Sequence, residues 1–442
     1  MHVWIDAAAA PPSLTAFGMS LVERHVTAAL KGGVPAARIV IDTGGGAPDL
    51  PPAMIDRGVG VRRGEGDAAT RLAAFAAETS DSVFAVAGDS VVDPRLFAHL
   101  SAQHESQVVT GDTTVPRALA GVWSAVFGDW PETGSAGDAA VLLAPGAVVP
   151  PAADVHRLAG QLLTSGSARK LSVDGFDAHL ALQRRDVPFW VRRITDARSR
   201  AEVERFLFDA SYKGSTDVFT RYVYPYLVWP LTRLATRWRV HPNTITWVSI
   251  AATFAAVPCF ALGWWAWGFL LAYVMSVLDS VDGKVARLTF TSSALGNVLD
   301  HGLDIVHPPF WYGAWAVGLI GLPAVAAWWQ GNGPRDPLIG AAILLLILYV
   351  ADRLVLAVYK WRYRGRGLHA HAPIDGAVRA VIARRNVFLP LFLVGVAFGL
   401  GRATFWLIVA WQAATVAWHA GRTVWVVARG EMPRGAVAIH QQ

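Results

Sequence analysis

The sequence predicts two unlike domains: an N-terminal α/β domain and a C-terminal all-α domain of six transmembrane helices. Up to about Lys213 the chain is alanine-rich, and its charged residues are spread throughout. Beyond Thr244 it contains long apolar runs rich in Trp, Phe, Leu and Val. Over the whole chain 53% of residues are hydrophobic and 16% are charged, which disfavours an ordinary soluble protein. We place an α/β domain at 1–186, a connector at 187–243 and a membrane domain at 244–430.

Short apolar runs alternate with helical patterns in the first domain. The residues 18–30 have helical periodicity, and the strand candidates are 3–6, 38–42, 58–62, 82–87, 108–111 and 139–143. Strands that alternate with helices indicate a parallel or mostly parallel sheet. The connector ends in an aromatic and basic segment, 217–238, which is typical of a helix that lies in the membrane interface. A soluble helix that packs on the first domain is the alternative.

Six segments near the ~20 residues needed to cross a bilayer follow the connector. They lie at about 244–262, 265–287, 295–322, 338–359, 387–401 and 403–427. The connection from 360 to 385 is rich in Lys and Arg, whereas the opposite connections carry only Arg335, beside Asp336, and Arg402. By the positive-inside rule, both termini and this connection face the cytoplasm. The start of the chain has no evident signal peptide, so we expect the first domain to stay in the cytoplasm.

The formal net charge of +6 comes from basic residues that crowd between apolar segments. This placement fits contact with anionic lipid headgroups, and no nucleic-acid-binding motif supports a nucleic-acid partner. Cys259 is the only cysteine, so the chain forms no internal disulfide.

Four aspartates mark the candidate site. Asp279 and Asp282 fall on one face of the second predicted span, and Asp300 and Asp304 fall on one face of the third. A short turn at about 289–293 makes the two helices antiparallel neighbours, so the four carboxylates converge near the cytoplasmic boundary. The small residues Gly283, Ala286 and Gly296 on these faces leave room for a phosphate or nucleotide to approach the backbone. Arg287 and Lys284 supply positive charge for phosphate oxygens.

Four carboxylates at this place need a positive partner. An Asp within the membrane costs ~2.5–3.5 kcal/mol even on mild scales, and neighbouring anions repel each other. Hard divalent cations prefer oxygen ligands, so Mg²⁺, Mn²⁺ or Ca²⁺ fits the ligand set. A proton or cation transporter also uses buried carboxylates, but its acids are spread along a path through the bilayer rather than clustered at one edge.

The pattern D-x2-DG-x2-AR-x8-G-x3-D-x3-D resembles the signature of the CDP-alcohol phosphotransferase family, and every specified position is present. The resemblance covers roughly the C-terminal half. It implies a two-metal site held by Asp279, Asp282, Asp300 and Asp304, with Asp304 also the general base that activates an acceptor hydroxyl. It also implies that the CDP part of a CDP-linked donor contacts Asp279, Asp282, Gly283, Ala286, Arg287 and Gly296. The reaction would release CMP.

The first domain is similar to the nucleotidyltransferase-like domain of bifunctional inositol-phosphate cytidylyltransferases of this family. Those enzymes hold a nucleoside triphosphate in a glycine-rich, basic loop after the first strand, but here 6–16 reads DAAAAPPSLTA. Nothing in this loop would cradle a triphosphate. We therefore favour a degenerate domain over an active cytidylyltransferase, and Asp89 is either a helix cap or a metal ligand.

The acceptor is an alcohol, for which the sequence offers only basic residues. Arg353, Arg384 and Arg385 are candidates for an anionic acceptor such as inositol phosphate. Their alternatives are an ion pair between Arg353 and Asp352, and the usual basic residues at cytoplasmic helix ends. We also expect a homodimer embedded in the lipid bilayer.

Overall fold

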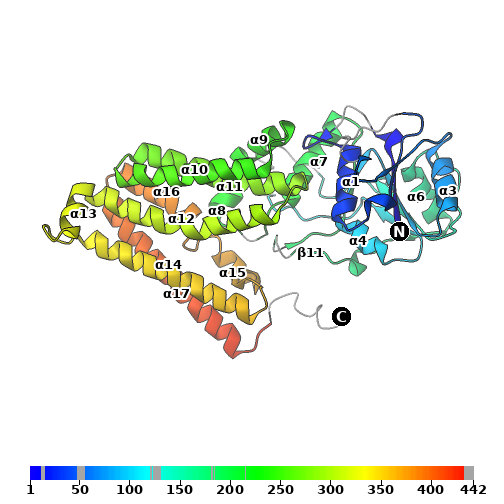
Figure 1. Ribbon diagram of the computed structural model, residues 1–442. Coiled ribbons are helices and arrows are strands. Elements are labelled where there is room, and N and C mark those ends of the chain that lie inside the picture. Colours follow the sequence, from blue (N-terminus) through cyan, green and yellow to red (C-terminus); the bar gives the residue numbers. More distant parts are fainter. Residues whose placement is uncertain are drawn as a thin grey trace. The chain divides into compact units, whose positions relative to one another are not determined.

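The structure is a computed structural model, and it describes residues 1–10, 15–46, 55–119, 122, 131–180, 183, 185–214 and 216–432, without the side chains of 295, 297, 300, 301 and 303. The chain divides into two compact units. The first is Met1–Tyr212 with Thr236–Arg239 and Arg287–Phe290, and the second is Lys213–Ala235 with Val240–Ala286 and Thr291–Gln442. Figure 1 shows the ribbon of both units.

The first unit contains a mixed seven-stranded sheet of order β10-β8-β9-β6-β1-β4-β5. The strands are β1 (His2–Asp6), β4 (Ile39–Asp42), β5 (Gly60–Arg62), β6 (Val83–Ala87), β8 (Gln107–Thr110), β9 (Ala139–Leu143) and β10 (Arg169–Lys170). Strands β5, β4, β1 and β6 run parallel, and β9 runs antiparallel to both β6 and β8. The prediction of a mostly parallel α/β sheet is therefore confirmed.

Helices cover both faces of this sheet (Figure 1). Successive side chains of β1 point to opposite faces of the sheet, so each face has its own core cluster. Val3 and Ile5 belong to one cluster, and Trp4 belongs to the other. Residues of α1 (Leu21–Lys31) and α4 (Arg95–Ser101) pack in the first cluster. Residues of α3 (Ala68–Glu78) and α6 (Val155–Thr164) pack in the second.

The remaining elements of the first unit are short, apart from one helix. They are η1 (Ala7–Ala9), β2 (Thr15–Ala16), β3 (Met19–Ser20), η2 (Ala36–Arg38), β7 (Ser90–Val92), η3 (Val173–Gly175), β11 (His179–Leu180), β12 (Arg185–Asp186), β13 (Val191–Arg193) and α7 (Ala197–Ala210). Helix α7 begins at a capping box, in which the Asp196 carboxylate accepts from Ser199 N–H.

The second unit is helical. Its elements are α8 (Val218–Tyr222), α9 (Tyr224–Arg237), α10 (Pro242–Ala261), α11 (Trp265–Leu288), α12 (Ala294–Ile320), α13 (Leu322–Trp329), α14 (Pro337–Arg362), η4 (Leu368–Ala370), α15 (Pro373–Val378), α16 (Arg385–Ala397) and α17 (Gly401–Ala428). Six of these helices lie where the six spans are predicted, and the predicted turn separates α11 from α12.

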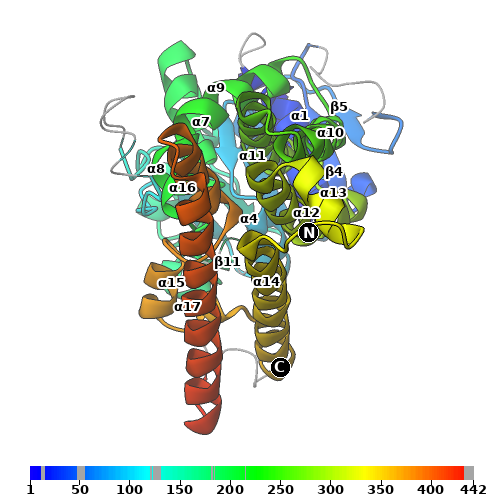
Figure 2. The same ribbon diagram turned by 90° about the vertical axis from the view of Figure 1, so that its left-hand side faces the viewer.

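Aromatic side chains hold the helices of the second unit together. Phe260 of α10 meets Trp311 and Trp315 of α12 edge-on, with ring centroids 6.0 and 5.8 Å apart. Trp315 stacks on Phe392 of α16 at 4.3 Å. Helices α14 and α17 run beside each other, as both ribbon views show (Figures 1 and 2).

The membrane-spanning property is confirmed only in part. Among the described residues, Pro242–Ala261 and Pro337–Arg362 are long and apolar enough to cross a membrane, and a bent pair of helices from Asp304 to Trp329 could make a third span. Helix α16 is only 13 residues long, and α11 carries charged residues in its second half. Six complete spans therefore stay a prediction.

Candidate active site

Helix α11 carries the first half of the aspartate motif. Its residues Asp279 and Asp282 lie in the second half of the helix, and Arg287 lies in its last turn. Gly283 and Ala286 occupy the same stretch and are partly buried. The residues Arg287–Phe290 group with the first unit, so the candidate site in the second unit does not include Arg287.

Helix α12 carries the second half of the motif and is capped by Ser293, whose hydroxyl accepts a hydrogen bond from Gly296 N–H at 3.0 Å. This cap fixes the start of the helix, and Asp300 and Asp304 follow one turn apart. The side chain of Asp300 lies outside the described part of the structure. The side chain of Asp304 is 48% exposed, so a substrate can reach it.

Arg385 joins the two halves of the motif. One terminal nitrogen of its guanidinium lies 2.8 Å from Asp279 Oδ2, and the other lies 3.2 Å from Asp304 Oδ1. Arg385 is the first residue of α16, so one cation draws together carboxylates from α11 and α12. The predicted convergence of the carboxylates is thus seen for Asp279 and Asp304. The sequence had suggested an acceptor-binding role for Arg385, and the structure adds this contact.

Asp282 faces a different neighbour. It is buried, and its Oδ2 accepts a hydrogen bond from the Thr246 hydroxyl of α10 at 2.6 Å. Its Oδ1 lies 2.5 Å from Gly283 N. The Thr246 hydroxyl therefore orients one oxygen of Asp282, a contact that the motif itself does not predict.

Gly296 lies where α12 packs closely against Asn243 of α10. A Cβ at this position would lie 3.0 Å from Asn243 Oδ1 and 3.1 Å from Ser293 Oγ. The space above Gly296 is thus occupied by the Asn243 amide. The predicted approach of a nucleotide to Gly296 is not tested by this contact.

The donor set fits a divalent metal in its chemistry. Two carboxylates from different helices converge on one cationic group, and Asp300 lies one turn from Asp304 on the same helix. Among the side chains that the structure describes, no group of three or more His, Cys, Asp or Glu residues has a metal-binding arrangement. Since the Asp300 side chain lies outside the described part of the structure, the four-aspartate metal site stays a prediction.

The start of α16 carries a second polar cluster. Arg384 lies 3.8 Å from Asp217, and the Asn386 amide donates to Asp217 Oδ2 at 3.2 Å. Asp217 is buried and caps α8 through Thr220 N–H. The cluster connects α8 to the helix that carries Arg385. Sequence analysis did not find it, because 169 positions separate Asp217 from Asn386.

Arg353 lies in α14, away from this cluster. It pairs with Asp352, whose carboxylate is fully buried. The Oδ1 atom of Asp352 also lies 2.5 Å from Nδ1 of His419 in α17. The ion-pair alternative for Arg353 therefore matches the contact seen, and an acceptor contact stays untested.

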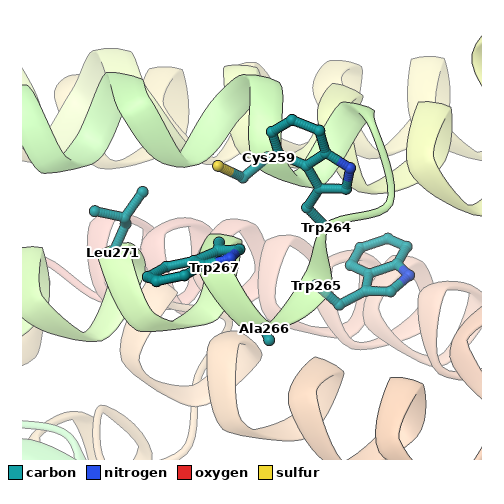
Figure 3. Close-up of a pocket in the computed structure, with 6 residues that line it drawn as sticks. All are labelled: Cys259, Trp264, Trp265, Ala266, Trp267 and Leu271. Carbon is teal, nitrogen blue, oxygen red and sulfur yellow. The ribbon is translucent and has the colours of Figure 1, made fainter.

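An apolar pocket of about 590 Å³ lies elsewhere in the second unit. Figure 3 shows its lining at the junction of α10 and α11: Cys259, Trp264, Trp265, Ala266, Trp267 and Leu271. Trp267 precedes Asp279 by roughly 18 Å along α11, at 1.5 Å per residue. The pocket is therefore separate from the aspartates.

Carboxylates in the first unit are already paired with cations. Arg71 donates to Asp6 and to Asp42, both at 2.7 Å, and Asp89 lies 2.9 Å from His156 and 2.6 Å from Arg193. Burial raises the pKa of Asp6 to about 6 despite Arg71. Burial would also raise the pKa of Asp89, but His156 and Arg193 outweigh it and hold that pKa below its ordinary value. The carboxylate of Asp89 binds these side chains and does not act as a helix cap.

Comparison with known proteins identifies the helical part. Residues 239–428 match the family model of CDP-alcohol phosphatidyltransferases. A phosphatidylinositol phosphate synthase of Mycobacteroides abscessus is 28% identical over 204 residues, which cover 44% of this chain and 83% of that protein. One from Cutibacterium acnes is 36% identical over 76 residues, which cover 17% of this chain and 37% of that protein. Cholinephosphotransferase 1 of Mus musculus is 28% identical over 137 residues, which cover 28% of this chain and 34% of that protein.

The match spans about a third of the length of the mouse and Cutibacterium relatives. The family model begins at the end of the connector and ends within the last helix, so it contains the whole aspartate motif and Arg385. The aspartate signature and the matched residues agree. The part of the chain from 239 to 428 is therefore similar to CDP-alcohol phosphatidyltransferases, which supports the resemblance carried by the aspartate motif.

Proposed function

We propose that this protein transfers a substituted phosphate from a CDP-linked donor to an alcohol and releases CMP. The observation that carries the proposal is the convergence of Asp279 and Asp304 on Arg385 within the family motif. The similar proteins, phosphatidylinositol phosphate synthase and cholinephosphotransferase, suggest an acceptor with a polar head, such as inositol phosphate.

Asp304 is the proposed general base. Its carboxylate is half exposed, so an acceptor hydroxyl can approach it. The acceptor oxygen bonds to the phosphorus of the substituted phosphate that is transferred. The bond between that phosphorus and the CMP oxygen breaks. The hydroxyl proton passes to Asp304, and the CMP oxygen keeps the bonding electrons.

A divalent metal, Mg²⁺ or Mn²⁺, would be held by Asp279, Asp282, Asp300 and Asp304. When bound, it would neutralise the charge that develops on the diphosphate oxygens. Asp282 is oriented for this role by its hydrogen bond from Thr246. Arg385 would bind an anionic acceptor, because its guanidinium matches phosphate oxygens and already lies beside the proposed base.

The first unit is proposed not to be an active cytidylyltransferase. The carboxylates at the ends of β1 and β4 share Arg71, and Asp89 is paired with His156 and Arg193. A metal–triphosphate complex would have to break these pairs. The homodimer, the cytoplasmic orientation and six spans stay predictions that light scattering and accessibility labelling would test.

The direct experiment is a CMP-release assay. Purified full-length protein is incubated with CDP-diacylglycerol or CDP-inositol, each with inositol, inositol phosphate and choline as acceptors. CMP should form with at least one pair, stop with EDTA and resume with Mg²⁺ or Mn²⁺. If no pair yields CMP and ions instead cross the membrane of proteoliposomes in a way that Asp279→Asn abolishes, the protein is a transporter.

A further inference from the structure

Two consecutive prolines interrupt the hydrogen bonding of α12 just after Asp304. Pro308 and Pro309 lie inside the helix and have no N–H. In an α-helix each N–H donates to the carbonyl four residues earlier, so the carbonyls of Asp304 and Ile305 lose their donors. An unpaired backbone carbonyl is costly within a membrane, where neighbouring helices usually supply the missing partner.

Tyr349 of α14 supplies that partner. Its hydroxyl donates to the Ile305 carbonyl at 2.9 Å and lies 3.4 Å from the Asp304 carbonyl. These are the two carbonyls that the prolines leave without a helical donor. The contact is therefore specific to this break in the helix, and it lies on the turn that carries the proposed base.

The Tyr349 ring is itself held on two sides. The guanidinium carbon of Arg353 lies 5.2 Å from the ring centroid, and the Tyr312 ring meets it edge-on at 6.1 Å. Arg353 is fixed by Asp352, which His419 of α17 contacts in turn. A chain of contacts thus runs from α17 through α14 to the backbone of Asp304.

We propose that Tyr349 is a positioning residue for Asp304. Its hydroxyl replaces the helical hydrogen bond that Pro309 removes, and so it fixes the turn from which the Asp304 carboxylate reaches Arg385 and the acceptor. Arg353 contributes indirectly, because its contact with the Tyr349 ring helps to hold that ring in place. The inference rests on the proposed role of Asp304 as base.

The test compares Tyr349→Phe in two backgrounds of the full-length protein. In the natural background it should lower kcat for CMP release about tenfold, with KM for the CDP-linked donor changed less than twofold, because a small displacement of the base affects turnover more than donor binding. In a Pro309→Ala background the restored N–H can donate to Ile305. Tyr349→Phe should then change kcat less than twofold relative to Pro309→Ala alone.

Tyr312→Phe is the matched control, because it also removes a hydroxyl from a buried tyrosine beside Tyr349. This hydroxyl makes no hydrogen bond to the described residues. Equal kcat losses from Tyr349→Phe in both backgrounds, or none in the natural one, would overturn the proposal. If Tyr349→Phe alone does not fold, the double variant should fold, and failure of both contradicts the inference. If the wild type releases no CMP, the proposed function fails. Thermal unfolding of the same variants then still tests the hydrogen bond, since only the natural background should be destabilised by Tyr349→Phe.

Discussion

Replacing Arg385 by Gln would test how strongly one cation stabilises the carboxylates of the candidate site. The variant keeps a polar side chain but removes the cation shared by Asp279 and Asp304. The side chains of Asp279 and Arg385 are 15% and 10% exposed, so this pair is nearly buried, whereas Asp304 is 48% exposed. Breaking a buried pair costs about 3–5 kcal/mol, and an exposed pair about 0–1 kcal/mol.

The metal-free variant should therefore lose about 3 kcal/mol, most of it from Asp279. For a helical unit of this size, each kcal/mol changes Tm by about 2–4 °C, so Tm should fall by about 6–12 °C in EDTA. In Arg385→Gln, a divalent cation can supply the missing positive charge without having to displace the Arg385 guanidinium, as it would in the wild type. Mg²⁺ or Mn²⁺ should thus raise the Tm of Arg385→Gln more than that of the wild type.

The assay is thermal unfolding of the purified protein in detergent, with EDTA and with added metal. Arg384→Gln is the matched control, because Arg384 is the adjacent basic residue and pairs with Asp217 instead. The reasoning is refuted if Arg385→Gln unfolds at the wild-type temperature in EDTA. It is also refuted if metal raises its Tm no more than that of Arg384→Gln.

Three further predictions concern other parts of the chain. The pKa of Asp6 is about 6 in the folded protein and ordinarily 3.8, so Asp6 stabilises the fold fully below about pH 4 and loses this effect as the pH rises to about 6. Asp6→Asn should therefore remove a fall in the free energy of unfolding on the order of 3 kcal/mol over this pH range. An unchanged pH profile of unfolding in the variant would contradict this. Gly296→Ala should force Asn243 aside and lower Tm by a few degrees. Thermal unfolding checks this, with Gly302→Ala as the control because an added Cβ there meets open space. The full-length protein should make no CDP-inositol from CTP and inositol phosphate, while a truncated chain beginning near Val203 keeps phosphotransfer; robust cytidylyl transfer, or complete loss of phosphotransfer in a well-folded truncation, would oppose this.

Local patterns predicted the elements of the fold well. The strand candidates at 3–6 and 139–143 match β1 and β9, and the turn before Ala294 separates the helices that carry the aspartates. These features depend on residues close in sequence, such as alternation along a strand or the Ser293 cap. Helices α11 and α12 each carry two of the aspartates, as predicted, and the sharing of a helix face within each pair stays a prediction.

The long-range contacts of the site could not be predicted in the same way. Thr246 reaches Asp282 across 36 positions, and Arg385 reaches Asp279 across 106. Such pairs depend on how whole helices pack, which periodicity does not determine. One signal was present in the sequence: Pro308 and Pro309 mark a turn whose carbonyls need an outside donor, although Tyr349 as that donor emerges only from the packing of α12 against α14.

The most direct test of the account is the effect of Asp304→Asn on donor binding and turnover in the same preparation. Asn keeps the shape of the side chain but cannot accept the proton of the acceptor hydroxyl. The account predicts that Asp304→Asn still binds the CDP-linked donor while CMP release falls by at least about 100-fold, whereas Asp279→Asn weakens donor binding itself. CMP release at the wild-type rate by Asp304→Asn would contradict its role as the base.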